Sequence, residues 1–498
     1  MVTKKKSNKI KNQNYSTKST FKKFRKKDIP KLNYGILHSQ FGLPDGVSIV
    51  MRQIEEVLIN HMNIPKKNIK YLVGKNKKSE KRIKQDSLFW DGNSINKIAI
   101  QNFENGLGGE KSEIIEKTIN EAKLKIEKWI QKEKIEVIIA HNMSHPVNFI
   151  FAIALHRYYR DSIKKNIKTP KYLLWWHDSH LERKHFQKPS SDISEYLIEG
   201  IPGRFVEYIL FINSTQFKNA EKYMLQLDSL KPGFYESISD NHDVIYNTTD
   251  TFIETYDDLE KDWSIRVEKF LEDFKVNNLL KENNIKLKET LFVLQHTRVI
   301  PRKRIDFALE YIFELFEKLK KNRRKKIKGI YFFVSGHTGL KSQSTRSKLI
   351  RLHKKLSKKY NTNKIFLRFY DKVNTKSDLN FEEIPHIFAK LGGITTYFSE
   401  VEGFGNNLLE VLASGLIPVV YTYPVFKEDI AKFKFKCISL EEFCVDEKSM
   451  KSTIEIINNN RKRKIWVNRN LKIIRKNFKH QVMTRKITRA IIRKRTHI

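Results

Sequence analysis

The chain has 498 residues, 40% of them apolar, so it is long enough for two or three packed domains and too apolar to be disordered as a whole. Its two cysteines, Cys437 and Cys444, exclude a disulfide framework and a four-cysteine metal site, and they fit a reducing compartment such as the cytoplasm. The net charge of +40 favours anionic partners: nucleotide diphosphates, nucleic acid or an anionic membrane face. A lysine-rich compositional bias would produce the same charge without a functional cause.

The N-terminal half begins with a polar, lysine-rich stretch, residues 1–30, which predicts a disordered tail and lacks the apolar core of a secretory signal. Short apolar runs then alternate with helical periodicity. Strands are predicted at 32–37, 69–73, 98–101, 137–140, 172–176, 208–212 and 244–246, and helices near 50–58, 112–133 and 146–165. The longest apolar runs, such as 149–155, are far too short to span a membrane.

The C-terminal half follows a charged, mostly helical segment, 250–288, that we interpret as a connector. Strands are predicted at 291–295, 329–334, 364–369, 394–398 and 417–421, with helices near 304–320, 343–359, 382–391, 406–414 and 447–460. Strands that alternate with helices in both halves predict an α/β protein with two doubly wound parallel sheets. Because ligands bind beyond the carboxyl ends of such strands, a cleft between the sheets is the expected site.

The most informative segment is 399–420, in which an apolar strand is followed by a glycine-containing turn and a helix. Gly403 and Gly405 allow the backbone to approach a ligand closely, and the helix that opens near Asn406 presents unpaired N–H groups to an anion. Glu402 precedes the turn and Glu410 lies one turn into the helix. Both carboxylates can accept hydrogen bonds from sugar hydroxyls. A strand-turn-helix unit with ordinary surface glutamates is the alternative.

This segment resembles the donor-binding motif of family-four retaining glycosyltransferases, which have the GT-B fold. The resemblance implies two Rossmann-like domains that face each other across a cleft, with a C-terminal helix crossing back to the N-terminal domain. It also implies that Glu402 and the glycine turn hold the transferred sugar and that Glu410 holds the ribose of the nucleotide. The implied donor-binding residues are Gly403, Phe404, Gly405, Asn406, Asn407, Leu408 and Glu410.

The start of the C-terminal domain, 291–306, resembles the family's strand followed by an arginine and a lysine five residues later, here Arg298 and Lys303. Fixed cations at this point stabilise the negative charge that develops on the leaving diphosphate. The family usually has glycine where this chain has Thr297 and Arg304, so the role of the lysine could also fall on Arg302 or Arg304. A solvated charge cluster would have the same composition.

Two motifs in the N-terminal half match less specifically. The loop that contains Gly42 and Gly46 follows the first strand and corresponds to a glycine-rich loop of the family, near the donor phosphate or the acceptor. His177 ends a strand at a position where related enzymes have a histidine that touches the donor sugar. A plain loop and a structural histidine are the alternatives. Three neighbouring residues could contact the acceptor or pair with one another: Asp178, Glu182 and Arg183.

Three other loops are weaker candidates. The run 141–145 follows a strand and could line the acceptor side, whereas 335–339 could approach the nucleotide. The run 423–430 resembles a segment of some bacterial family members and predicts no chemistry. No group of histidines or acids has the spacing of metal ligands, so neither a metal nor a cofactor is expected.

We therefore expect a retaining, metal-independent hexosyltransferase that moves a sugar from a nucleoside diphosphate sugar to a glycan, a lipid-linked molecule or a small molecule. The predicted domains are a basic tail at 1–30, an acceptor domain with its connector at 31–285, a nucleotide-sugar domain at 286–465 and a basic helical segment at 466–498. Alternatives are a nucleic-acid-binding protein that uses its basic surface, without a recognisable specificity motif, and a GT-B-shaped epimerase or phosphorylase.

The C-terminal segment 461–498 contains no acid. Its apolar residues up to about 480 suit a helix that packs on the N-terminal domain. The last eighteen residues are predicted to extend beyond this helix and to lie on an anionic membrane, which would place the enzyme at the inner face of a membrane beside a lipid-linked acceptor.

Overall fold

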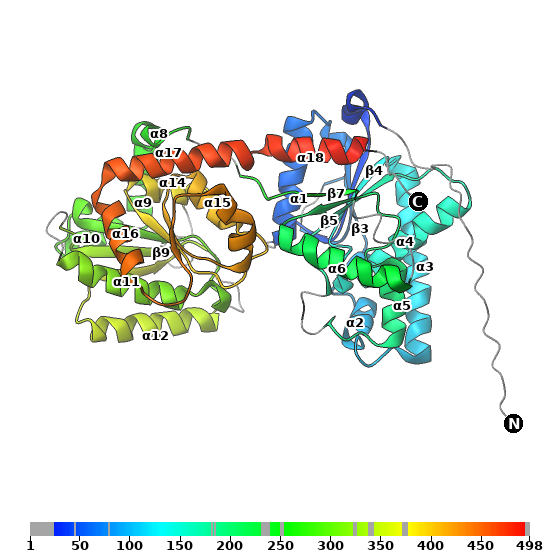
Figure 1. Ribbon diagram of the computed structural model, residues 1–498, viewed down its shortest axis with the longest axis horizontal. Coiled ribbons are helices and arrows are strands. Elements are labelled where there is room, and N and C mark those ends of the chain that lie inside the picture. The colour runs from blue at the N-terminus through cyan, green and yellow to red at the C-terminus, as the bar shows by residue number, and fades with distance from the viewer. Residues whose placement is uncertain are drawn as a thin grey trace. The chain divides into compact units, whose positions relative to one another are not determined.

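The computed structural model describes residues 24–43, 46–77, 80–180, 183, 186–230, 240–249, 253–321, 326–336, 343–370 and 377–493 (Figure 1). It divides into two compact units. The first unit comprises Met1–Ile212, Gln216–Ile245 and Thr484–Ile498, and the second comprises Asn213–Thr215 and Tyr246–Met483. The chain therefore passes between the units several times, and neither unit is one continuous stretch of sequence.

The first unit contains a seven-stranded parallel sheet with the strand order β3-β2-β1-β4-β5-β6-β7. Its strands are β1 Tyr34–Phe41, β2 Ile69–Asn76, β3 Ile83–Gln85, β4 Val137–His141, β5 Lys171–Trp176, β6 Tyr208–Phe211 and β7 His242–Val244. Every residue of β4 and β5 is buried, as is typical of central strands covered by helices on both faces. The helices with residues in this unit are α1 Gly46–Glu56, α2 Ser94–Gln101, α3 Gly108–Glu133, α4 Phe149–Lys164, α5 Ser191–Gly200, α6 Ser214–Leu230 and α18 His480–Ile492.

Two local predictions for this unit are wrong. The apolar run at 98–101 is the end of helix α2, because Ile95, Ile98 and Ala99 share a helical face and the Asn93 side chain caps the helix start by accepting from the amide of Asn96 at 2.6 Å. Residues 26–30, the end of the stretch predicted as a disordered tail, lie in a short 3-10 helix, Lys26–Lys31. Residues 1–23 of the predicted tail lie outside the described residues.

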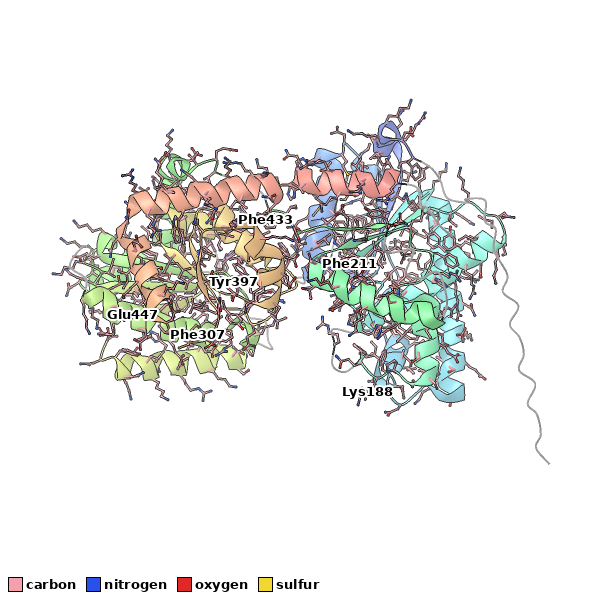
Figure 2. The ribbon with its side chains drawn as sticks, in the orientation of Figure 1. Lys188, Phe211, Phe307, Tyr397, Phe433 and Glu447 are labelled. Carbon is pink, nitrogen blue, oxygen red and sulfur yellow. The ribbon has the colours of Figure 1, made fainter. Side chains whose placement is uncertain are left out.

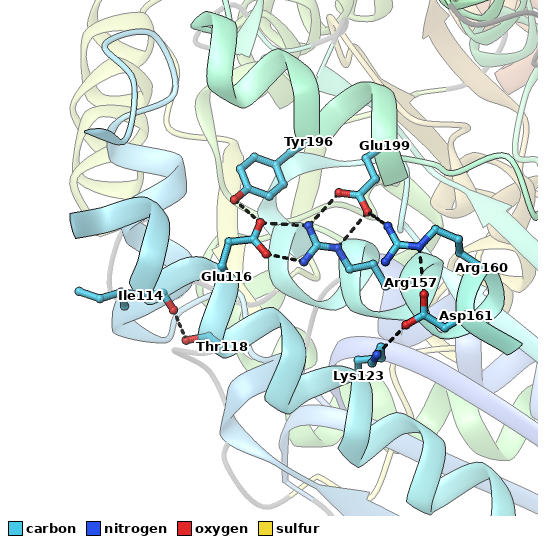
Figure 3. Close-up of polar contacts among 9 residues, drawn as sticks. All are labelled: Ile114, Glu116, Thr118, Lys123, Arg157, Arg160, Asp161, Tyr196 and Glu199. Atoms are coloured by element: carbon cyan, nitrogen blue, oxygen red, sulfur yellow. Dashed lines mark hydrogen bonds and ion pairs between the residues drawn. The ribbon is translucent and has the colours of Figure 1, made fainter. Parts of the chain in front are cut away.

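Helices α3, α4 and α5 of the first unit are joined by a network of charged side chains (Figure 3). Arg157 of α4 donates to Glu116 of α3 at 2.6 Å and to Glu199 of α5 at 2.9 Å, while Tyr196 donates to Glu116 at 2.6 Å and Arg160 to Glu199 at 2.8 Å. Burial alone would lower the pKa of Arg157, but the two carboxylates outweigh it and raise the pKa. The network supplies a partner for a cation that would otherwise be costly to bury.

The second unit contains a six-stranded parallel sheet with the order β10-β9-β8-β11-β12-β13. Its strands are β8 Thr290–Gln295, β9 Gly329–Val334, β10 Ile365–Phe369, β11 Ile394–Tyr397, β12 Pro418–Tyr421 and β13 Ile438–Leu440. Its helices are α8 Tyr256–Asp262, α9 Ser264–Asp273, α10 Val276–Glu282, α11 Ile305–Lys320, α12 Gln343–Lys359, α14 Ile384–Lys390, α15 Asn406–Ala413, α16 Glu447–Asn458 and α17 Asn460–Asn477.

The connector predicted at 250–288 lies in the second unit, although the sequence assigned it to the first domain. Its helices α8, α9 and α10 bury apolar side chains in the core of the second unit, among them Leu259, Phe270 and Leu271. This packing follows from the amphipathic pattern of α9, which the high charge of the segment obscures in the sequence.

Helix α18 runs from the second unit into the first, so that residues from Thr484 onward belong to the first unit. Ile487 and Ile491 are buried, and Lys486 donates to Asp243 of β7 at 2.7 Å. The expected return of the C-terminal helix is confirmed, but its predicted extent is wrong. The residues from His480 to Ile492 make the return themselves: Met483, Ile487 and Ile491 are buried, whereas Ile492 is exposed. No helix among the described residues combines the length and the hydropathy that crossing a membrane requires.

Candidate active site

Three loops of the second unit follow neighbouring strands at the carboxyl edge of its sheet. Strand β8 lies between β9 and β11, so the segments that begin at His296, Ser335 and Phe398 emerge side by side. The first leads into α11 and the third into α15. The predicted residues Arg298, Lys303, Glu402 and Glu410 all lie on these segments or at the start of these helices.

Glu402 is the centre of a buried polar cluster. Its side chain is 8% exposed and pairs with the Lys303 ammonium, which is 5% exposed. Arg302 donates to the second carboxylate oxygen of Glu402 at 3.1 Å and also to the carbonyl oxygen of Val401. Tyr397 lies at the end of β11 (Figure 2) and donates to Glu402 Oε1 at 3.0 Å. The structure thus brings the two motifs together, although 99 positions separate Lys303 from Glu402 in the sequence.

The charges in this cluster oppose the effect of burial. Burial by itself would raise the pKa of Glu402, but the positive charges of Lys303 and Arg302 outweigh it and hold the pKa below its ordinary value. Burial lowers the pKa of Lys303, and the nearby arginines act in the same direction against the attraction of Glu402. An anionic ligand placed beside Lys303 would favour its charged form.

The turn between Glu402 and α15 has a backbone that requires glycine. Gly405 has φ +114°, and a Cβ at this position would lie 2.2 Å from the hydroxyl oxygen of Tyr423. That hydroxyl donates to the carbonyl oxygen of Phe404 at 2.8 Å, and the Asn213 side chain donates to the carbonyl oxygen of Gly403 at 2.6 Å. The turn therefore has a fixed shape that leads directly into the N-terminus of α15.

The start of α15 can face an anion. The Gly405 carbonyl oxygen accepts from the amides of Leu408 and Leu409 at 2.9 and 3.2 Å, so the preceding amides of Asn406 and Asn407 belong to the first turn, which has no intrahelical acceptors. Such amides bind phosphate or a sugar oxygen well. Phe404 and Leu408 are buried and anchor the turn from the core side, so their side chains are not available to a ligand.

Glu410 lies on the first turns of α15 with 29% of its side chain exposed. Its Oε2 accepts from Asn407 at 3.2 Å and lies 3.2 Å from His296 Nε2. The other ring nitrogen of His296 is 2.8 Å from the hydroxyl of Ser335, and its ring stacks on Phe381 at 4.2 Å. A proton on Nε2 lets His296 donate to Glu410, and Ser335 can then donate to Nδ1. The sequence analysis missed His296, although its position directly after β8 is the kind of signal that would have found it.

Arg298 differs from the cations that follow it. Its side chain is exposed, and among the described residues it makes no hydrogen bond or ion pair. Arg302 and Lys303 are engaged with Glu402, and Arg304 pairs with Glu400 at 3.1 Å. Arg298 is therefore placed to bind an anion without first breaking an internal contact. Residues 337–339 of the loop predicted to approach the nucleotide lie outside the described residues.

The predicted residues of the N-terminal half lie in the first unit, at the carboxyl edge of its own sheet. Gly42 follows β1 and has φ +74°, and Gly46 begins α1. Residues 44 and 45 of this loop lie outside the described residues. The positive φ explains a glycine at position 42 through backbone geometry, whereas a Cβ on Gly46 would meet no neighbour.

A group of buried histidines lies towards the carboxyl ends of β1, β4 and β5. His38 Nδ1 is 3.1 Å from the carbonyl oxygen of His141, and His141 Nδ1 is 3.0 Å from His177 Nε2. Burial lowers the pKa of His177 to about 3 and moves the pKa of His141 well below its ordinary value. Burial also lowers the pKa of His180 to about 4. The rings of His141, His177 and His180 are therefore neutral at pH 7 and can exchange hydrogen bonds with a sugar without adding charge.

Asp178 and Arg183, which follow His177, form an ion pair with each other. Asp178 is also fixed by its amide, which donates to the Asn142 side chain at 3.3 Å, and by its carbonyl oxygen, which accepts from Ser144 at 2.8 Å. The sequence leaves open whether these residues contact the acceptor or pair with one another, and the structure shows that Asp178 and Arg183 pair. Glu182 lies outside the described residues.

The histidines predict a pH dependence of stability. Because the pKa of folded His177 is about 3 against an ordinary 6.5, the unfolded chain binds a proton that the folded chain does not between these pH values. The free energy of unfolding should therefore fall as the pH is lowered from about 6.5 towards 4, with each such histidine contributing a slope of about 1.4 kcal/mol per pH unit. Urea unfolding at several pH values measures this slope. In the variant His177→Asn, this slope should be smaller by up to about 1.4 kcal/mol per pH unit, the contribution of one bound proton. An unchanged slope would contradict the burial of a neutral ring at position 177.

Known proteins resemble this chain in sequence and in fold. No family model matches the chain. It is 26% identical over 448 residues to mannosylglucosylglycerate synthase of Petrotoga mobilis, a match that covers 84% of this chain and 89% of that protein. A protein of the same name from Thermotoga maritima is 40% identical over 70 residues, which are 12% of this chain and 16% of that protein.

Solved structures share the fold at low identity. A glycosyltransferase from Rickettsia africae matches with a TM-score of 0.54 and 14% identity, covering 93% of this chain and 99% of that one. WaaG, a glycosyltransferase involved in lipopolysaccharide biosynthesis, matches with a TM-score of 0.51 and 13% identity over 92% of this chain and 99% of its own. Taken together, the two parallel sheets and these structural matches show that the protein has the GT-B fold, and along most of its sequence it is similar to a mannosylglucosylglycerate synthase.

Proposed function

We propose that the protein transfers a hexose from a nucleoside diphosphate sugar to an acceptor hydroxyl, with retention of configuration and without a metal. The observation that carries this proposal is the cluster at the start of α15, where Glu402, Lys303 and Glu410 surround a fixed glycine turn. Carboxylates suit the hydroxyls of a sugar and a ribose, and cations with helix N–H groups suit a diphosphate.

Each group has one role in this proposal. Glu402 and the amides of the turn bind the transferred sugar, and Glu410 binds the ribose. Arg298 and Lys303 stabilise the charge that grows on the diphosphate as the glycosidic bond to the sugar breaks. The acceptor hydroxyl attacks the anomeric carbon from the face that the diphosphate leaves, and a diphosphate oxygen takes its proton. His177 and its neighbours in the first unit provide neutral hydrogen-bonding groups for a sugar.

We further propose that the transferred sugar is mannose and that the acceptor is glucosylglycerate. This proposal is supported by the mannosylglucosylglycerate synthase of Petrotoga mobilis, which matches along most of both chains. UDP-glucose is a second donor to test, because Anabaena HepE, which shares the fold, has been solved in complex with it (TM-score 0.51, 13% identity).

A panel of nucleotide sugars tests the proposal. The full chain is incubated with GDP-mannose, UDP-glucose, ADP-glucose or UDP-galactose, each with and without glucosylglycerate, and the released nucleotide and the product mass are measured. We expect release that depends on both a donor and an acceptor, a product with the anomeric configuration of the donor by NMR, and the same rate in the presence of EDTA. No product from any pair would overturn the proposed transfer, and loss of activity with EDTA would overturn metal independence alone.

A further inference from the structure

A second carboxylate of the second unit is fully buried outside the Glu402 cluster. Asp429 lies in the helical turn Phe426–Ile430 and has no exposed surface. It accepts from the amide of Ser214 at 3.0 and 3.1 Å, from the Ser214 hydroxyl at 2.5 Å and from the hydroxyl of Tyr246 at 2.9 Å. Lys432 lies 3.6 Å from the same carboxylate. The charge is thus matched by several donors, which makes this a strong and geometrically defined anchor.

Ser214 and Tyr246, which donate to Asp429, are both connected to the turn beside Glu402. Asn213, the residue before Ser214, donates to the carbonyl oxygen of Gly403 at 2.6 Å. The ring of Tyr246 stacks on the ring of Phe404, with centroids 5.0 Å apart and an angle of 19° between the planes. One carboxylate therefore connects the side chain that fixes residue 403 with the ring that fixes residue 404.

The connection matters because the turn contains two glycines. Gly403 and Gly405 give the turn more backbone freedom than any other residue type would, so external contacts must select its shape. Asn213 and Tyr246 come from two short segments of the second unit, Asn213–Thr215 and the start of Tyr246–Met483, which the chain reaches directly from the first unit. Neither segment contributes a strand to the second unit's sheet. Asp429 is one of the groups that hold them, together with Lys432, which donates to the hydroxyl of Tyr246 at 2.6 Å.

We propose that Asp429 is a positioning residue for the donor-binding turn and acts through Asn213 and Tyr246. It touches neither Glu402 nor the helix start that would face the donor. Its effect is to keep the amides at 405–407 in the arrangement that binds the donor, which would otherwise have to be selected at the moment of binding. This inference rests on the function proposed for the same site, but the shape of the turn can be measured without any activity.

The first test is amide hydrogen exchange of the unliganded full chain, followed over the peptide that contains residues 403–409. The variant Asp429→Asn keeps the size of the side chain but loses the charge and one acceptor. We expect faster exchange in this peptide by about tenfold or more, and unchanged exchange in peptides of the first sheet. Glu442→Gln, an exposed carboxylate of the same unit, is the matched control and should leave the peptide unchanged. The milder variants Ser214→Ala and Asn213→Ala decide the question if Asp429→Asn does not fold.

The second test is a double-variant cycle on nucleotide binding, with UDP, GDP and ADP titrated separately. Asp429→Asn and Asn213→Ala should each raise the Kd of the nucleotide that binds, or the KM of the donor, by about tenfold. The double variant should bind the nucleotide as tightly as the single variant with the lower affinity, because both changes break the same connection. Tyr246→Phe keeps the stacked ring and should have a smaller effect than Asp429→Asn.

Two results would overturn the inference. One is a variant Asp429→Asn that melts at a lower temperature but has wild-type exchange at 403–409, which assigns Asp429 to stability alone. The other is a double variant in which the effects of the single variants multiply, which makes Asp429 and Asn213 independent. If UDP, GDP and ADP all fail to bind to the wild-type chain, the proposed function fails, and the exchange experiment still decides whether Asp429 positions the turn.

Discussion

Replacement of Arg298 by alanine is expected to lower kcat by about 10²–10³ and to leave the melting temperature unchanged. The rate should fall because a preorganised cation beside a developing negative charge contributes most in the transition state. Stability should not change because the side chain is exposed and, among the described residues, has no internal partner. Steady-state kinetics with the donor that the panel identifies and thermal unfolding of the same preparation measure both quantities.

The controls for Arg298 separate its position from its charge. Lys348→Ala removes an exposed cation of helix α12 in the same unit and should have no effect on kcat. Arg298→Lys keeps the charge but loses the planar fork that can bind two phosphate oxygens, so it should recover only part of the rate. A kcat for Arg298→Ala within a factor of three of wild type would remove Arg298 from the proposed machinery.

The variant Glu402→Gln is expected to lose both transfer and stability. Transfer should fall by one to two decades, because a charge-assisted hydrogen bond to a ligand contributes about 1.5–3 kcal/mol. Stability at pH 7 should fall by about 3–5 kcal/mol, because Lys303 is left buried without its partner. The second effect revises what the motif alone predicts, namely a loss of activity in an intact fold. Urea unfolding and donor kinetics measure the two effects separately.

A compensating change distinguishes the two roles of Glu402. In Glu402→Gln combined with Lys303→Met, the buried cation is gone, so stability should return towards wild type while transfer stays low. Glu410→Gln is the matched variant, at the second glutamate of the same motif. Glu410 is partly exposed, and its loss leaves no buried lysine without a partner, so this variant should lose donor affinity with little loss of stability. Near-wild-type transfer by both single variants would refute the donor-site assignment.

The fold was predictable because its elements carry local signals. The buried strands β4, β5, β8 and β11 are apolar runs, and Gly405 marks a turn that no other residue fits. The errors arose where local pattern is weak. The three-residue edge strand β3 is too short and polar to be recognised, and the run at 98–101 is apolar enough for a strand but lies in a capped helix.

The contacts that shape the site were not predictable, because they join residues far apart in the sequence. Nothing near Glu402 indicates that Lys303 and Arg302 neutralise it, or that Asn213 holds the carbonyl of Gly403. The run at 423–430 carried no chemical signal, since Tyr423 and Asp429 act through a backbone carbonyl and a distant segment. Motifs identify the residues that meet a ligand, and only the structure identifies those that hold the motif in place.

The location of α18 also has a consequence for biosynthesis. The first unit is completed by residues that follow Thr484, and the buried Ile487 and Ile491 close over part of its apolar surface. On the ribosome, this surface stays uncovered while the whole second unit is translated, because the chain grows from its N-terminus. The second unit ends at Met483, so it can fold before the residues from Thr484 onward become available. The nascent first unit must wait, and during that interval its open edge is a natural target for a chaperone.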